Sequence, residues 1–158
     1  MWNSPARGIS FEYSIDIIFP RSYIQVRWHG RSSTPASLDW WETLGEEEQI
    51  EISAKVELLE KHGPVLPRPH ADVIVMSKHS NMKELRGRAI IRGHRSELRI
   101  LYAFDPRRTA ILLIGGDKTG NPNWYNEYVP LADKIFDQHL REIAKNAGSE
   151  GKTRGKKV

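Results

Sequence analysis

The sequence contains no cysteine, so disulfide bonds and thiolate metal sites are excluded. No apolar run approaches the roughly 20 residues that a membrane-spanning helix needs. The N-terminus also lacks the basic stretch and apolar core of a secretion signal. The mean hydropathy of −0.56 suits a soluble chain. We therefore expect a cytoplasmic protein.

The residue patterns of two common kinds of ligand site, a phosphate-binding loop and a histidine metal site, are also absent from the sequence. The segment GGDKTG at residues 115–120 superficially resembles a phosphate-binding loop, but its Lys-Thr pair follows the glycines too closely for the spacing GxxxxGK[ST]. Four histidines, His62, His70, His79 and His94, are scattered without a paired spacing such as HExxH. We expect neither a metal ion nor another cofactor.

Positive charge is in modest excess. The 158 residues include 24 Lys and Arg against 20 Asp and Glu, for a net charge of +4, and the isoelectric point is near 9.4. This balance is compatible with an acidic partner such as nucleic acid, and equally with a basic protein whose charges are simply solvated. The length fits one domain, which would bury about 68% of the surface that its unfolded chain exposes.

The centre of the chain predicts an antiparallel sheet. Two apolar, β-prone runs at residues 98–104 and 109–114 flank a turn at Asp105 and Pro106, which predicts a hairpin. Residues 82–91 supply a third strand, which is expected to turn at Gly93 and His94. Three strands in a meander form a stable sheet if one face is covered.

Alternation along the middle strand divides its side chains between two faces. One face carries Leu98, Ile100, Tyr102 and Phe104, and the other carries Arg99, Leu101 and Ala103. The last strand is expected to end at Gly115 and Gly116, with Lys118 just beyond it. Basic residues therefore gather at the ends and turns of the predicted sheet.

The first part of the chain predicts strands and a helical hairpin. Residues 11–19 alternate between apolar and polar side chains, and residues 23–28 form a second candidate strand, which we prefer. A helix is expected to start at Thr34 and Pro35 and to end at Gly45. Residues 46–62 predict a second helix, and the two helices are expected to cover the sheet.

The remaining segments predict smaller elements and a last helix. A loop rich in proline and histidine contains a candidate strand at residues 73–76. Residues 130–147 have helical periodicity, with Pro130 at the expected start and Gly148 at the expected end. Residues 149–158 are basic and are expected to be disordered.

This order of elements, together with the segments NMKELR, LRILYAFDPRR, AILLIGGDKTG and WY, resembles the RelE/ParE superfamily of bacterial toxins, and in particular its HigB-like, phage Gp49-like branch. The resemblance covers residues 28–142 and is most specific over residues 82–125. It implies a RelE-like α+β fold, in which an N-terminal strand and a two-helix hairpin pack on an antiparallel meander sheet followed by a C-terminal helix.

The resemblance also implies a domain division and a function. Residues 1–22 would be an N-terminal extension, residues 23–147 the toxin domain and residues 148–158 a basic disordered tail; native translation starting near Val26 is an additional hypothesis. The implied function is a ribosome-dependent endoribonuclease that cuts messenger RNA and inhibits translation and growth. The implied partners are a cognate antitoxin, often a helix-turn-helix protein, and mRNA on the ribosome, with no membrane. The free toxin would be a monomer or weak homodimer.

The chemistry of such cleavage can be stated independently. Without a metal, the ribose 2′-OH attacks the adjacent phosphate and leaves a cyclic phosphate and a free 5′-OH. The site must take up the 2′-OH proton, stabilise charge on phosphorus and protonate the leaving oxygen. Arginine suits the second task because its planar fork binds phosphate oxygens and stays charged.

Four residues match catalytic positions of the family. Arg99 is the first choice for stabilising the phosphorane, and Arg86 occupies a second strand position on the active face. Lys118 would hold phosphate or assist proton transfer, and Tyr125 would stack on a base or move a proton. The same residues could instead be ordinary surface charges and a core aromatic. Further predicted RNA contacts are Lys83, Arg88, His94, Arg95, Lys78 and His79.

Two other functions fit the same fold. ParE-like relatives inhibit DNA gyrase through protein contact and need no catalytic residues. A non-catalytic interaction module is the third hypothesis, in which the strand at residues 11–19 pairs with a partner at its edge.

Overall fold

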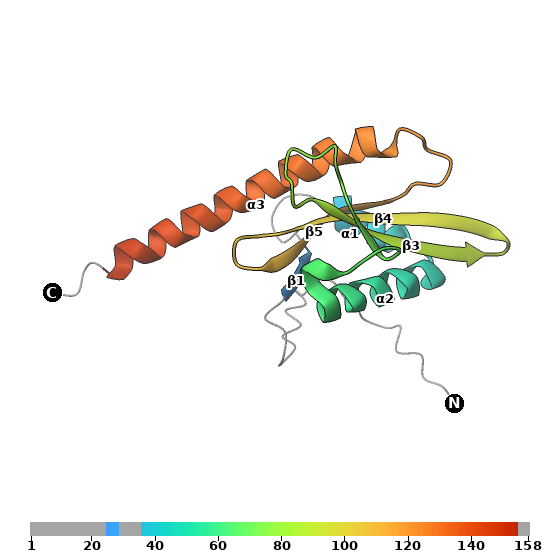
Figure 1. The fold of residues 1–158 in the computed structure, drawn as a ribbon, viewed down its shortest axis with the longest axis horizontal. Helices are drawn as coiled ribbons and strands as arrows, with labels where there is room; N and C mark the ends of the chain where they lie inside the picture. Colours follow the sequence, from blue (N-terminus) through green and yellow to red (C-terminus); the bar gives the residue numbers. More distant parts are fainter. Residues whose placement is uncertain (1–24, 29–35, 155–158) are drawn as a thin grey trace, which may run out of the picture.

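A five-stranded sheet with the order β1-β5-β4-β3-β2 is the centre of the fold (Figure 1). The computed structural model describes residues 25–28 and 36–154. The candidate strand at residues 11–19 and the helix start predicted at Thr34 and Pro35 lie outside these residues.

Three strands form the predicted antiparallel meander: β3 (Lys83–Ile91), β4 (His94–Phe104) and β5 (Thr109–Asp117). The short strand β2 (Ala71–Val73) extends the sheet beside β3, antiparallel to it. The strand β1 (Gln25–Trp28) lies parallel to β5 at the opposite edge. The predicted meander and N-terminal strand are therefore confirmed.

Several strand boundaries were predicted wrongly. The last strand does not end at Gly115 and Gly116 but runs through both to Asp117. The turn before β4 consists of Arg92 and Gly93, both with positive φ of 48° and 78°, so His94 already belongs to the strand. Positive φ at both central residues is the requirement of a two-residue type I′ hairpin turn. Because of this tight turn, β4 begins at His94 and is longer than the apolar run at residues 98–104 indicated.

The helices α1 (Ala36–Thr43) and α2 (Glu46–His62) form the predicted hairpin on one face of the sheet (Figure 1). At the start of α2, the Gly45 N–H donates a hydrogen bond of 2.9 Å to the Glu48 carboxylate. At its end, Gly63 has a φ of 61°, which glycine adopts without a Cβ penalty. Both predicted helix ends are confirmed.

The sheet face under α2 is apolar. Leu98, Ile100 and Tyr102 of β4 point into it, as the alternation predicts, and are fully buried. The core cluster on this face comprises Trp41, Ile52, Leu59, Leu66, Ala71, Leu85, Leu98, Ile100, Tyr102, Ala110 and Leu112. Burial of this many large apolar side chains accounts for the attachment of the helical hairpin to the sheet.

The opposite face carries α3 (Trp124–Arg154), which lies across the sheet and extends beyond it (Figure 1). Its core cluster comprises Ile74, Met82, Leu101, Ala103, Ile111, Leu113, Ile114, Trp124, Val129, Ala132 and Phe136. The predicted ends of this helix are wrong, because it begins before Pro130 and continues past Gly148. Pro130 is in its second turn, where proline removes one backbone hydrogen bond without ending the helix.

Gly115 and Gly116 allow aromatic rings to approach β5 from both sides. A Cβ atom on Gly115 would lie 2.2 Å from the Trp40 ring of α1. On Gly116 it would lie 2.8 Å from the Trp124 indole nitrogen and 2.9 Å from the Tyr128 ring. The Trp124 and Tyr128 rings stack 4.4 Å apart, which fixes the first turns of α3 on the strand.

The predicted turn between β4 and β5 is tied to α3 by Asp105. This carboxylate is buried and accepts a hydrogen bond from the Thr109 N–H at 3.0 Å, and it lies 3.0 Å from the His139 ring on α3. Burial acts to raise the pKa of Asp105, but hydrogen bonds with His139, Thr109 and Arg107 hold it below its usual value.

Of the helices in the described part of the chain, none has the length and hydropathy to cross a membrane.

Candidate functional site

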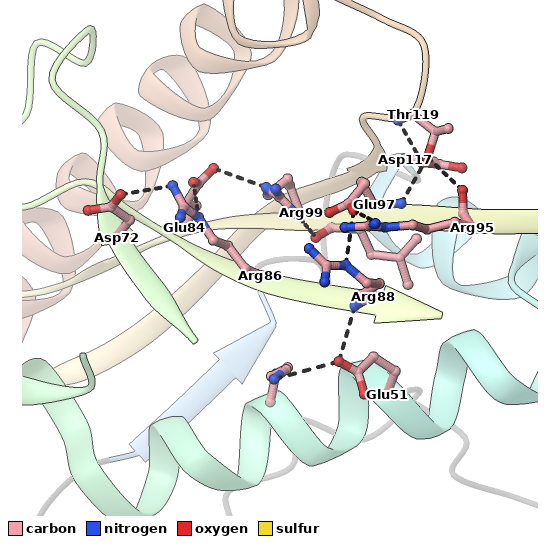
Figure 2. A network of polar contacts seen from close by, with 12 residues as sticks. Glu51, Asp72, Glu84, Arg86, Arg88, Arg95, Glu97, Arg99, Asp117 and Thr119 are labelled. Atoms are coloured by element: carbon pink, nitrogen blue, oxygen red, sulfur yellow. Dashed lines mark hydrogen bonds and ion pairs between the residues drawn. The ribbon is translucent and has the colours of Figure 1, made fainter. Parts of the chain in front are cut away.

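The candidate site begins with two arginines that face each other across the β3-β4 hairpin. Arg86 on β3 is paired directly with Arg99 on β4, and both point to the α3 side of the sheet. Like charges directly opposite in a sheet repel each other. The arrangement therefore needs carboxylates nearby, and Figure 2 shows Glu84 and Glu97 beside the pair.

Glu84 supplies the first carboxylate, with only 1% of its side chain exposed. Its Oε1 atom accepts hydrogen bonds from Arg86 Nε at 2.7 Å and from the Tyr125 hydroxyl at 3.2 Å. Its Oε2 atom lies 3.7 Å from Arg99 Nε, which is an ion-pair distance but too long for a hydrogen bond. Glu84 thus joins three of the four predicted catalytic residues.

Lys118 joins the same group through Tyr125. Its ammonium lies 5.4 Å from the centroid of the Tyr125 ring, a cation-π distance. Burial and the negative charge of Glu84 raise the pKa of Tyr125, while a hydrogen bond with Arg99 acts in the opposite direction. The phenol is therefore protonated at neutral pH. All four predicted catalytic residues lie together, although they come from four separate segments of the chain.

Asp72 holds Arg86 from its other side. The Arg86 Nη2 atom donates a hydrogen bond of 2.8 Å to Asp72 on β2, while its Nε atom binds Glu84. Arg68 makes a second ion pair with Asp72, at 2.5 Å. Arg86 is therefore fixed between two carboxylates, which determines where its guanidinium points.

Glu97 is the second carboxylate of the face, and three arginines converge on it. Arg95 Nε lies 2.6 Å from Glu97 Oε1, Arg88 Nε lies 3.0 Å from the same oxygen, and Arg99 Nη1 lies 3.5 Å from Oε2. Burial acts to raise the pKa of Glu97, but hydrogen bonds from Arg95 and Arg88 hold it below its usual value. Arg99 thus lies between Glu84 and Glu97, at ion-pair distance from both carboxylates.

The loop after β5 fixes the backbone of Glu97 through two hydrogen bonds. The Glu97 N–H donates to Thr119 Oγ1 at 2.8 Å, and the Lys118 N–H donates to the Glu97 carbonyl at 2.8 Å. Asp117 accepts from the Thr119 N–H at 2.9 Å and so closes the turn. Lys118 is held beside Tyr125 by this turn, which the glycine-rich sequence predicted only as a loop.

The predicted RNA-binding residues divide into separate places. Arg88 and Arg95 belong to the group around Glu97, and His94 is exposed at the start of β4. Lys83 points to the opposite, α2 side, where its ammonium donates to the Pro64 carbonyl at 2.6 Å.

Lys78 and His79 also lie away from the arginines. Both pair with Asp137 of α3, the His79 ring at 2.8 Å. Asp137 follows Tyr125 by about 18 Å along the helix, at 1.5 Å per residue. These two residues therefore attach the loop before β3 to α3 and do not contact the site around Glu84.

Sequence reasoning missed the carboxylates of the site, although a pattern for them was present. The tripeptide Glu-Leu-Arg occurs at residues 84–86 and again at residues 97–99. Residues two positions apart in a strand share one face, so each tripeptide places a glutamate beside an arginine. Among the described residues, no group of three or more His, Asp or Glu side chains could hold a metal ion.

Comparison with known proteins identifies a matching family and similar proteins that are named as toxins. The family described as "Phage derived protein Gp49-like" matches residues 39–137. A Mycobacterium tuberculosis protein named "Putative toxin HigB2" is 44% identical over 105 residues, which cover 66% of this chain and 51% of that protein. "Putative toxin HigB3" from the same organism is 43% identical over 102 residues, covering 64% of this chain and 84% of that protein. The chain thus spans about half the length of the first relative. No solved structure matches it significantly.

Proposed function

This chain belongs to the phage-derived Gp49-like family and is a HigB-like protein, and we propose that it is the toxin of a toxin-antitoxin module that cleaves RNA without a metal. The observation that carries the proposal is the convergence of Arg86, Arg99 and Tyr125 on Glu84, with Lys118 beside the tyrosine. Buried charges of this kind are costly to maintain and gather at functional sites.

The reaction proposed for this site is attack of the ribose 2′-OH on the adjacent phosphate. The O2′–P bond forms, the P–O5′ bond breaks, and the products are a 2′,3′-cyclic phosphate and a 5′-OH. Arg99 and Arg86 would hold the phosphate oxygens as negative charge accumulates on them, because guanidinium groups bind such oxygens as fixed donors.

Proton transfer is assigned to the groups next to the arginines. Tyr125 is protonated at neutral pH, since a phenol has a pKa of about 10 and burial and Glu84 raise the pKa of Tyr125 further, so it carries a proton for the leaving O5′ atom. Glu84 is the one carboxylate among the five side chains of this group, and uptake of the 2′-OH proton is assigned to it. Lys118 would hold a neighbouring phosphate.

The proposed substrate and partner follow from the family. Two exposed arginines, Arg88 and Arg95, lie beside the proposed site and support a polyanionic substrate. The resemblance to the RelE/ParE superfamily supports messenger RNA in the ribosomal A site as that substrate. A cognate antitoxin encoded beside the toxin would neutralise it.

The experiment that tests this proposal is inducible expression of the wild type, Arg99→Ala and Arg141→Ala in a bacterial host, with growth followed and RNA 5′ ends mapped. Arg141 is an exposed arginine on α3, outside the site, and is the charge-matched control. The wild type and Arg141→Ala should arrest growth and create new 5′ ends within translated messages. Arg99→Ala should lose both effects, with cleavage reduced about 10²- to 10³-fold.

Folding of each purified variant is checked by circular dichroism, so that loss of the fold is not read as loss of chemistry. Growth arrest without new RNA ends would contradict the ribonuclease and favour gyrase inhibition, for which DNA supercoiling is then measured. Cleavage that persists in a folded Arg99→Ala protein would remove Arg99 from the site.

A further inference from the structure

Glu97 lies where three arginine side chains converge. Arg88 and Arg95 both bind its Oε1 atom, and Arg99 approaches its Oε2 atom. The three guanidinium groups repel one another, so they stay close together only around an anion. An internal carboxylate meets this requirement in the free protein.

A phosphate group has the same requirements as this carboxylate. It is an anion whose oxygens accept hydrogen bonds from several donors, and arginine forks bind it especially well. Phosphodiesters of RNA carry one such anion per nucleotide. The space between the three arginines therefore has the donors and the charge of a phosphate-binding position, and Glu97 fills it from within.

We propose that an RNA phosphate displaces the Glu97 side chain and binds to Arg88, Arg95 and Arg99, so that Glu97 is an internal phosphate substitute that restrains RNA binding. This inference rests on the proposed function, because it identifies how that substrate enters the site. The ligand class is a phosphodiester of single-stranded RNA, next to the phosphate that reacts.

Exposure of the four side chains supports a path for this exchange. The Arg88 and Arg95 side chains are 58% and 54% exposed, Glu97 is 24% exposed, and Arg99 is only 11% exposed. A phosphate arriving from solvent thus meets the two outer arginines first and Glu97 next. Arg99 lies behind Glu97 and is reached when the carboxylate leaves. Arg99 also lies beside Glu84, so the proposed phosphate-binding position is next to the residues that we propose to cleave RNA.

The exchange needs movement of one side chain only. The backbone of Glu97 is fixed by its N–H bond to Thr119 Oγ1 and by the bond from the Lys118 N–H to its carbonyl. Both contacts stay in place when the side chain rotates toward solvent. The three arginines would then keep their positions because a phosphate replaces the carboxylate between them.

The test measures binding of a 2′-O-methylated single-stranded hexaribonucleotide, which cannot be cleaved because its 2′ oxygens carry no proton. Titration calorimetry compares the wild-type protein with Glu97→Gln, which keeps the size of the side chain and removes its charge. Glu142→Gln is the control, since it makes the same charge change at an exposed position on α3. Glu97→Gln should bind about tenfold more tightly than wild type, and Glu142→Gln within about twofold of it.

Two double variants of the same net charge, Glu97→Gln/Arg95→Gln and Glu97→Gln/Arg141→Gln, separate this proposal from a general charge effect, and the gain in affinity should persist in the one that changes exposed Arg141 on α3. In Glu97→Gln/Arg95→Gln the gain should disappear, because one of the three phosphate donors is missing. Thermal unfolding in increasing sulfate provides a measurement that does not depend on RNA. Sulfate should raise the melting temperature of Glu97→Gln more than that of wild type, since an anion that binds the folded state stabilises it.

Unchanged or weaker binding by a folded Glu97→Gln protein would overturn the proposal and make Glu97 a residue that positions the arginines. The outcome is independent of the test of cleavage. If Glu97→Gln binds more tightly while no RNA is cut in cells, the phosphate position stands and the ribonuclease fails. If RNA is cut and Glu97→Gln gains no affinity, the ribonuclease stands and the phosphate position fails.

Discussion

The two faces of the β3-β4 hairpin differ in the side chains that they bury. Under α2 the buried part of the face is apolar, with Leu85, Leu98 and Ile100 fully buried. On the other face the apolar core includes Leu101 and lies under α3. Beyond Leu101 the same face carries charges, beginning with Arg99.

The start of α3 determines where this change occurs. Trp124 lies over Gly116, which is paired with Arg99, and the next residue, Tyr125, reaches Glu84 with its hydroxyl. The helix therefore covers the apolar part of the sheet, and its first residue lies at the boundary with the charged part. Such a helix both closes a core and places one residue of the candidate site, Tyr125, at the margin of that core.

The largest effect is expected from the apolar face. Replacing fully buried Ile100 with alanine, Ile100→Ala, removes packing atoms beneath α2 and should lower the free energy of unfolding by about 2–5 kcal/mol. Ile90→Ala on the neighbouring strand is the control, because Ile90 is 68% exposed and should change stability by less than about 0.5 kcal/mol. Urea unfolding of both variants makes the comparison. Similar losses in the two variants would mean that the α2 face is not the main core.

A smaller effect is expected where β5 admits an aromatic ring. Gly115→Ala places a methyl group 2.2 Å from the present position of the Trp40 ring, so the ring or the strand must shift. We expect a loss of about 1–3 kcal/mol, measured by thermal unfolding. Gly148→Ala, with no atom near its added methyl group, should instead stabilise α3 by up to about 1 kcal/mol. Stabilisation by both substitutions would show that Trp40 does not pack on Gly115.

The smallest effect concerns a buried acid without a cation. Burial, and then the charge of Glu57, raise the pKa of Glu60 on α2 to about 7. Its carboxylate has no hydrogen-bond partner within the described ranges. The pKa of Glu60 is higher in the folded protein than in the unfolded chain. The free energy of unfolding is therefore not reduced by Glu60 below about pH 4.5, and it falls as the pH rises to about 7.

Glu60→Gln should therefore stabilise the protein by about 1–2 kcal/mol at pH 8 and by almost nothing at pH 4, measured by urea unfolding at both values. Asp105 on the α3 side shows the opposite dependence, because its pKa is lowered and its contribution is lost as the pH falls below about 4. An equal effect of Glu60→Gln at the two pH values would show that the charge of Glu60 is not what destabilises the fold.

Most of the fold could be predicted from local patterns. Period-two alternation identified the faces of β4, and the Asp-Pro turn identified the hairpin that follows it. The ends of α3 could not be found in the same way. Pro130 is a frequent first residue of helices, but packing of Trp124 on Gly116 makes an earlier start favourable. The start of α3 is therefore determined by tertiary packing and not by the local helix preference of Pro130.

For the candidate site, the sequence indicated which basic and aromatic residues to consider, and it left open which side chains they contact. Arginine at position 99 and tyrosine at position 125 follow from the resemblance, and the structure places them together. The alternative interpretation of Arg99 as an ordinary surface charge does not fit its side chain, which is only 11% exposed. The two-residue spacing within a strand predicts the contact of Glu84 with Arg86. Contacts between strands, such as Arg88 with Glu97 and Arg99 with Glu84, depend on the pairing of β3 with β4, which one strand alone does not reveal.

The turn at Arg92 and Gly93 has a consequence for how this gene can change. Both residues have positive φ, and this two-residue connection sets which residue of β3 lies opposite each residue of β4. A codon inserted within either strand beside this turn would leave composition and hydropathy almost unchanged. Yet one strand would turn its other side to α3, and leucines would replace the arginines there. Tolerance to such insertions should therefore be low at a place that is exposed and remote from the core.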